Sequence, residues 1–126
     1  HAQLSGLIAA LGHKDLFMIG DAGMPIPPGV TVVDLALCGG VPTFCQVLDA
    51  VLEDTEIEFY TLAEEIKAKN PKLLDYIEGK MQHTPGEFIE HTALKEMSAQ
   101  VRFAIRTGEF TPYPNVILRA GVAFPA

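Results

Sequence analysis

Apolar residues recur along the chain with two alternating spacings, one typical of helices and the other typical of strands. Apolar residues at positions 4, 7, 8 and 11 recur every three to four residues, which predicts a helix over 4–11 that ends at Gly12 as its C-cap. A short apolar run, residues 16–19, is typical of a buried strand. The same criteria predict strands over 30–37, 57–62, 88–89, 101–105 and 115–119 with 122–124, and helices over 41–52, 71–81 and 91–99 with a helical turn over 63–67.

Helices and strands alternate through the whole chain, which favours an α/β sandwich with a largely parallel sheet flanked by helices. The length of 126 residues is that of one ordinary domain. No internal repeat, low-complexity tract or linker divides it, so we expect a single domain over 1–126. The helix over 41–52 is expected to turn one apolar face inward, made of Phe44, Val47, Leu48 and Val51.

Composition and charge exclude several classes of partner. Nine basic and 16 acidic residues give a net charge of −7 without any lysine or arginine cluster, so nucleic acid is not an expected partner. No apolar stretch reaches the roughly 18 residues of a membrane span, and no signal peptide is evident. The apolar fraction of 48% is high for so short a chain and predicts either buried subunit contacts or a well-filled core.

The two cysteines, Cys38 and Cys45, do not make a disulfide framework, and their spacing fits no usual zinc motif. We expect both to be small buried apolar residues of a cytoplasmic protein in a reducing environment. The chain begins at His1 rather than at a methionine, from which we expect a short N-terminal segment to be missing.

Polar residues at the ends of the predicted elements are the candidates for chemistry. His13 falls in the turn between the first helix and the first strand, and Asp21 comes just after that strand. Ligands of open α/β sheets bind beyond the carboxyl ends of strands, which favours Asp21 as a ligand residue. The alternatives are structural, because a histidine can cap a helix and an aspartate can make a turn. A metal site formed with His91 is conceivable, but no spacing supports it.

Four further candidates lie later in the chain. His91 and Lys95 are four residues apart and share a helix face, as residues of a solvated face also do. Tyr113 and Asn115 lie in a loop braced by prolines, which suits ligand binding or simply turn formation. Motifs of nucleotide-binding folds and serine hydrolases are absent from the sequence. The glutamates at 64 and 65 read as surface or helix-start charges.

Taken in order, these residues resemble the D-ribose pyranase family of sugar mutarotases, which includes a fucose mutarotase branch. The resemblance spans essentially the whole chain, and its last stretch is long and specific. The Asp-Ala-Gly-Met-Pro form resembles the ribose branch, whereas the fucose branch typically has a histidine where Gly23 stands. The matching stretches are residues 11–15 (LGHKD), 21–27 (DAGMPIP), 63–67 (AEEIK) and 105–118 (IRTGEFTPYPNVIL).

The resemblance implies an enzyme that interconverts the pyranose and furanose forms of D-ribose and exchanges its anomers. It implies a cytoplasmic homo-oligomer, usually a decamer of two stacked pentameric rings, with sites at subunit boundaries. Such ring opening is general acid/base chemistry and requires no metal, cofactor or covalent intermediate. The alternatives are a fucose-type mutarotase and a non-catalytic sugar-binding or transport-associated protein.

The resemblance also assigns roles to the candidates. His13 matches the catalytic acid/base, and Asp21 matches a residue that binds the sugar hydroxyls. Two positions depart from the family pattern. His1 stands where many relatives have asparagine, and Pro114 replaces a small residue, which puts the sugar preference in doubt. The remaining matches are Tyr113 and Asn115 in the same pocket, with His91 and Lys95 reaching in from the neighbouring subunit.

Overall fold

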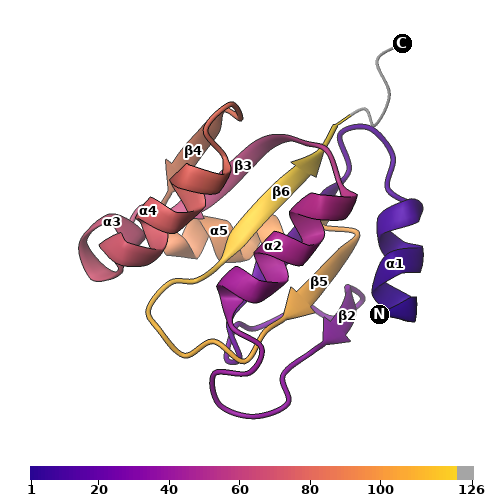
Figure 1. The fold of residues 1–126 in the computed structure, drawn as a ribbon, viewed down its shortest axis with the longest axis horizontal. Coiled ribbons are helices and arrows are strands. Elements are labelled where there is room, and N and C mark those ends of the chain that lie inside the picture. The colour runs from indigo at the N-terminus through magenta and orange to yellow at the C-terminus, as the bar shows by residue number, and fades with distance from the viewer. Residues whose placement is uncertain (122–126) are drawn as a thin grey trace.

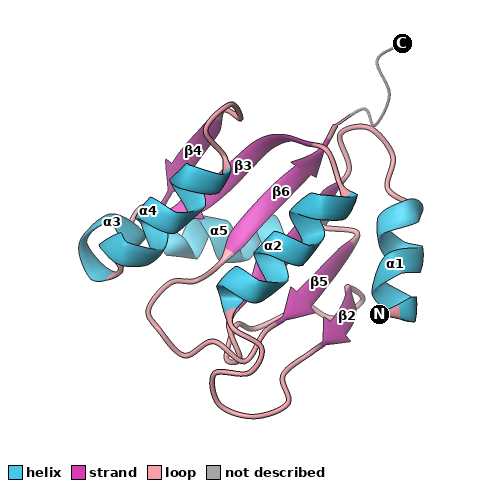
Figure 2. Cartoon of the chain, in the orientation of Figure 1, coloured by secondary structure: helices cyan, strands magenta, loops and turns pink. Residues whose placement is uncertain are grey.

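A six-stranded sheet forms the centre of the structure, with helices on both of its faces (Figures 1 and 2). The structure is a computed structural model, and it describes residues 1–121. The strands are β1 (Leu16–Gly20), β2 (Thr31–Asp34), β3 (Ile57–Ala63), β4 (Gly86–Ile89), β5 (Phe103–Arg106) and β6 (Val116–Ala120). The helices are α1 (Ala2–Ala9), α2 (Phe44–Asp54), α3 (Ile66–Lys69), α4 (Pro71–Lys80), α5 (His91–Met97) and a 3-10 turn, η1 (Ser98–Gln100).

The strand order is β2-β5-β1-β6-β3-β4, and one strand runs against the others. Strand β6 is antiparallel to both of its neighbours, β1 and β3. The other three pairings, β1 with β5, β2 with β5 and β3 with β4, are parallel. The expected α/β fold with a mostly parallel sheet is therefore confirmed. The reversal brings the amino end of β6 to the edge of the sheet where the parallel strands have their carboxyl ends.

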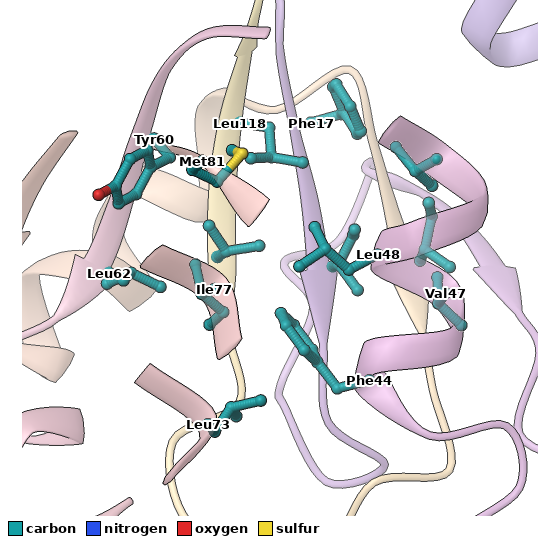
Figure 3. Packing of buried hydrophobic residues seen from close by; sticks show 14 of the residues in the cluster. Phe17, Phe44, Val47, Leu48, Tyr60, Leu62, Leu73, Ile77, Met81 and Leu118 are labelled. Carbon is teal, nitrogen blue, oxygen red and sulfur yellow. The ribbon is translucent and has the colours of Figure 1, made fainter. Parts of the chain in front are cut away.

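Strands β1, β5 and β6 are buried on both faces, which explains why their sequences are nearly continuous apolar runs. In β1, Phe17 and Ile19 face the larger core, whereas Met18 faces a smaller core on the opposite side. Helices α2 and α4 supply the larger core, where Phe44, Leu48 and Ile77 pack on the sheet (Figure 3). Helix α5 covers the opposite face, behind the sheet in Figure 1, and buries Leu94 there.

Helix α2 confirms the expected buried face, although it spans Phe44–Asp54 rather than 41–52. Its buried residues are the four that were expected: Phe44, Val47, Leu48 and Val51. A capping box at Thr43 fixes its start, because the Thr43 hydroxyl accepts the Gln46 backbone N–H at 3.1 Å and the Gln46 side chain accepts the Thr43 N–H at 2.9 Å.

The first helix differs from its expected bounds. It spans Ala2–Ala9, and its C-cap is Ala10 rather than Gly12. Its start is fixed by His1, whose ring Nδ1 accepts the Leu4 backbone N–H at 3.2 Å, a role that asparagine also fills well at this position. Gly12 instead belongs to a tight turn, where its N–H donates to the carboxylate of Asp15 at 2.8 Å.

Other expectations need smaller corrections. Strand β2 ends at Asp34, and the chain then turns through a short bridge between Cys38 and Val41. Both cysteines are free, but Cys38 is exposed and Cys45 is partly exposed, so the expectation that they are buried was wrong. The predicted strand segment 122–124 lies outside the described residues. Among residues 1–121, no helix is long and apolar enough to cross a membrane.

The burial of α2 gives a prediction for stability. Leu48 is fully buried between α2 and the sheet, so Leu48→Ala should leave a cavity and lower the free energy of unfolding by about 2–5 kcal/mol. The control is Glu53→Ala, an exposed position of the same helix, which should change it by less than about 0.5 kcal/mol. Urea unfolding measures both. Equal effects of the two substitutions would contradict the packing described for α2.

Candidate active site

Asp21 follows β1 directly and is held by two neighbours. Its backbone N–H donates to Oδ1 of Asn115 at 3.0 Å, and Nδ2 of Asn115 donates back to the Asp21 carboxylate at 3.3 Å. The other carboxylate oxygen accepts the Gly23 N–H at 2.8 Å. Asn115 is fully buried, and its two bonds, together with the one from Gly23, fix the direction of the carboxylate.

The direction of β6 explains this pairing. Asn115 comes just before β6, and only the antiparallel course of that strand brings its amino end beside the carboxyl end of β1. The approach is close, because a Cβ at Gly20 would lie 2.9 Å from Oδ1 of Asn115. Glycine at position 20 therefore leaves the space that the Asn115 amide occupies.

The loop that carries Asn115 is tied to the sheet and to α2. The Thr107 hydroxyl donates to the Gly20 carbonyl at 2.8 Å, and the Ala22 N–H donates to the Glu109 carbonyl at 3.1 Å. The Glu109 carboxylate accepts the Phe44 N–H at 3.0 Å, which places a negative charge at the amino end of α2. The loop is thus a braced platform, as loops that carry binding residues are.

Tyr113 lies on this loop with an unusual backbone conformation. Its φ is +58°, in the left-handed region that residues other than glycine rarely adopt. Its ring packs edge-to-face against the imidazole of His91, with centroids 5.0 Å apart and an angle of 81°. Asp21, Asn115, Tyr113 and His91 therefore form one cluster at the carboxyl edge of the sheet.

His91 opens α5, and its surroundings favour the neutral imidazole. Burial and the nearby Lys95 ammonium lower the pKa of His91 from its ordinary 6.5, against the opposing effect of Glu65 and Asp21. Its Nδ1 is buried and has no protein partner in the part of the chain that is described. Lys95 lies one turn further along α5, as expected from the spacing of four.

Glu65 was expected to be a surface or helix-start charge, and it lies at the start of a helix, but of a helix distant in sequence. Its carboxylate oxygens accept the His91 backbone N–H at 3.0 and 3.2 Å, so it helps to hold the start of α5. Glu64 does remain at the surface, where it pairs with Lys67 at 3.0 Å. Neither this role nor the loop contacts of Thr107 and Glu109 was predicted, because each joins segments that are distant in sequence.

His13 does not join the cluster within one chain. It lies before the amino end of β1, whereas Asp21 follows the carboxyl end, so about 16 Å of strand separates them at about 3.3 Å per residue. The His13 Nε2 is 2.9 Å from the Glu58 carboxylate. His91, by contrast, contacts Tyr113 of its own chain, so His13 rather than His91 lies away from the cluster. A single chain therefore does not bring His13 close to Asp21 and His91, as the metal site considered for these residues would require.

The chemistry of the cluster suits a neutral ligand rich in hydroxyl groups. The cluster supplies a carboxylate, an amide, a phenol and a neutral imidazole, and the Lys95 ammonium lies near the imidazole. Together these groups can accept and donate hydrogen bonds at several points. No group of three or more histidine, cysteine, aspartate or glutamate side chains within residues 1–121 is arranged to hold a metal ion.

Close packing at Gly20 gives a prediction. Gly20→Ala places a Cβ against Asn115 and 3.3 Å from the Met24 Cβ, so it should lower the free energy of unfolding by about 1–3 kcal/mol. Gly6→Ala is the control, because nothing lies within 4 Å of a Cβ there and α1 gains a better helix former. The midpoints of urea unfolding compare them. A Gly20→Ala protein as stable as Gly6→Ala would rule out the close approach of Asn115.

The neutral state of His91 predicts a pH effect. Below 6.5 the unfolded chain takes up a proton that folded His91 resists, so the free energy of unfolding should fall as pH drops through the window between 6.5 and the lowered pKa. His91→Asn should flatten this fall more than His83→Asn, the loss of an exposed histidine in a turn. Urea unfolding on either side of pH 6.5 tests it, and equal slopes for the two variants would contradict it.

Comparison with known proteins places the chain in a family. The model of the RbsD / FucU transport protein family matches residues 1–123. A D-ribose pyranase of Pediococcus pentosaceus is 47% identical over 124 residues, covering 98% of this chain and 95% of that protein. One of Geobacillus kaustophilus is 48% identical over 122 residues, covering 97% and 90%.

A solved structure of Bacillus subtilis RbsD complexed with D-ribose has the same fold. It superposes with a TM-score of 0.96 at 39% identity, covering 98% of this chain and 95% of that one. Fold, family model and relatives agree over nearly the whole length. The chain therefore belongs to the RbsD / FucU transport protein family.

Proposed function

We propose that this protein is a D-ribose pyranase, an isomerase that interconverts the pyranose and furanose forms and the anomers of D-ribose. The observation that carries the proposal is its 47% identity to a protein of that name over 98% of the chain. The cluster at the carboxyl edge supports it, because its donors and acceptors suit a neutral sugar. The solved relative complexed with D-ribose adds support for the sugar.

In this proposal the cluster binds the sugar. The Asp21 carboxylate accepts hydrogen bonds from sugar hydroxyls, and its bonds to Asn115 and Gly23 fix its direction beforehand. Neutral His91 offers its imidazole to another hydroxyl through Nε2, because Nδ1 is buried, while the Tyr113 ring restrains the imidazole. Binding groups held in place before the ligand arrives reduce the entropy that is lost on binding.

His13 is the proposed acid/base. Its neutral imidazole takes the proton of the anomeric hydroxyl, the electron pair of that O–H bond forms the C1 carbonyl, and the bond from C1 to the ring oxygen breaks. The ring oxygen gains a proton from Lys95 or water. Reclosure through a different hydroxyl reverses these transfers and changes the ring size. A histidine serves both directions, because imidazole ordinarily titrates near neutral pH.

The separation of His13 from the cluster supports a site shared between subunits. Because about 16 Å of strand lies between them in one chain, the proposal is that His13 of one subunit faces the cluster of its neighbour. Two large apolar side chains that are exposed in the single chain fit a contact between subunits: Leu37 is 81% and Phe110 72% exposed. Large apolar surfaces of this kind are often covered by a partner. The assembly proposed is a homodecamer of two pentameric rings.

A cytoplasmic location belongs to the same proposal. The two cysteines are unpaired, which fits a reducing compartment. The relatives named D-ribose pyranase act on a sugar, and a sugar taken up by a cell is processed after uptake.

Exchange NMR on equilibrated D-ribose tests the activity. A trace of protein should speed pyranose–furanose exchange over many turnovers per site, and His13→Ala should abolish this while leaving the assembly intact. Acceleration with fucose alone would favour a fucose-type mutarotase. Binding of ribose without acceleration of either sugar would favour a non-catalytic sugar-binding protein.

A mixing experiment tests the shared site. His13→Ala and Asp21→Ala chains should each be inactive alone, but co-assembled in equal amounts they should recover activity at about one quarter of the boundaries, because random head-to-tail pairing joins an intact His13 to an intact Asp21 there. The control is the double variant co-assembled with His13→Ala, which offers no intact boundary. Mixtures that remain inactive, although mass spectrometry finds both chains in one assembly, would refute the shared site.

A further inference from the structure

Two charged side chains, Glu58 and Arg119, lie beside His13 and outside the cluster. His13 lies in a tight turn, where the Lys14 N–H donates to the Ala120 carbonyl at 2.9 Å and the Asp15 N–H donates to the Gly12 carbonyl at 3.0 Å. These backbone hydrogen bonds fix the position of the main chain from which the His13 side chain projects. Its ring is then held by one group, the Glu58 carboxylate, 2.9 Å from Nε2.

Glu58 reaches His13 because of an irregularity in β3. The register of β3 against β6 pairs Ile57 with Ala120 and Phe59 with Arg119, so Glu58 is one extra residue between two paired ones. Such a β-bulge turns the side chain of the extra residue out of the regular alternation, and bulges are frequent beside functional sites. The bulge directs the carboxylate toward the end of the sheet where His13 lies.

Arg119 pairs with the same carboxylate. The Arg119 Nε is 2.8 Å from the other oxygen of Glu58, and the Arg119 guanidinium lies over the Phe59 ring at 4.7 Å. The hydrogen bond from His13 and the charge of Arg119 lower the pKa of Glu58. The carboxylate is therefore ionised at neutral pH and accepts hydrogen bonds without donating any.

We infer, on the basis of the proposed function, that Glu58 is a positioning residue for His13. The Glu58 carboxylate keeps a proton on Nε2 of His13. Nδ1 is therefore the nitrogen that exchanges protons with the sugar. An acceptor at 2.9 Å requires Nε2–H in both the neutral and the charged imidazole. Nδ1 has no hydrogen-bond partner within residues 1–121. Arg119 shares the carboxylate and holds it in this orientation.

The ring nitrogens themselves test the inference. In protein labelled with ¹⁵N only in its four histidines, with His13 assigned by its loss in His13→Gln, the neutral imidazole of wild type should carry its proton on Nε2. Glu58→Gln replaces an obligate acceptor by an amide that also donates, so a population with the proton on Nδ1 should appear. Glu58→Asp keeps the charge and should retain the wild-type tautomer at least in part.

Activity gives the second readout. Glu58→Gln should lower kcat for ribose exchange at least about tenfold with little change in KM, because a partner that fixes a catalytic tautomer acts on the chemical step. Glu58→Asp should recover part of this loss. The matched control is Glu56→Gln, an exposed carboxylate two residues earlier, which should change neither tautomer nor kcat.

The outcomes separate this inference from the proposed function. A wild-type His13 with its proton on Nδ1, or a Glu58→Gln protein that keeps both tautomer and kcat, would overturn the role of Glu58 even if ribose exchange is catalysed. Absence of ribose exchange in wild type would overturn the proposed function, while the tautomer comparison would still decide whether Glu58 orients His13. Amide spectra of each variant establish that its fold is intact.

Discussion

The antiparallel course of β6 between β1 and β3 is the constraint on which the rest of the structure depends. If β6 ran parallel to the other strands, Asn115, which precedes β6, would lie at the opposite end of the sheet from Asp21. The reversal places Asn115 beside Asp21 instead, and the buried amide then bonds both the backbone and the carboxylate of Asp21. The same reversal carries Arg119 to the other end of the sheet, next to Glu58. One strand direction therefore assembles both groups of polar residues.

Much of the fold could be predicted from the spacing of apolar residues along the sequence, because that spacing indicates which side chains are buried. The buried face of helix α2 could be predicted because its apolar spacing and its packing agree, whereas its start at Thr43 was not predicted. Strands β1 and β5 are apolar runs because they are buried on both faces. The prediction that Gly12 is a helix C-cap was wrong, because a glycine after an apolar stretch suits a C-cap and a tight turn equally. The hydrogen bond from Gly12 to the Asp15 carboxylate is made in the tight turn.

The candidate site could be predicted only in part, for a related reason. Sequence pattern placed Asp21 at the carboxyl end of a strand and put His91 and Lys95 on one helix, both of which are local features. It also placed His13 before the first strand and Asp21 after it, at opposite ends of β1. It did not place Glu58, whose contact with His13 arises from a bulge in the pairing of two strands far apart in sequence.

The two histidines show how one scaffold prepares the same side chain for different work. His91 is partly buried beside an ammonium, which favours a neutral ring, the form suited to hydrogen bonds with an uncharged ligand. His13 lies at the surface against an ionised carboxylate, a partner that tolerates either charge state of the ring while fixing where one proton sits. Binding needs a constant charge, and acid/base transfer needs a changing one. Because opposite ends of β1 supply these environments, contact between chains is what would join a binding half-site to a proton-transfer half-site.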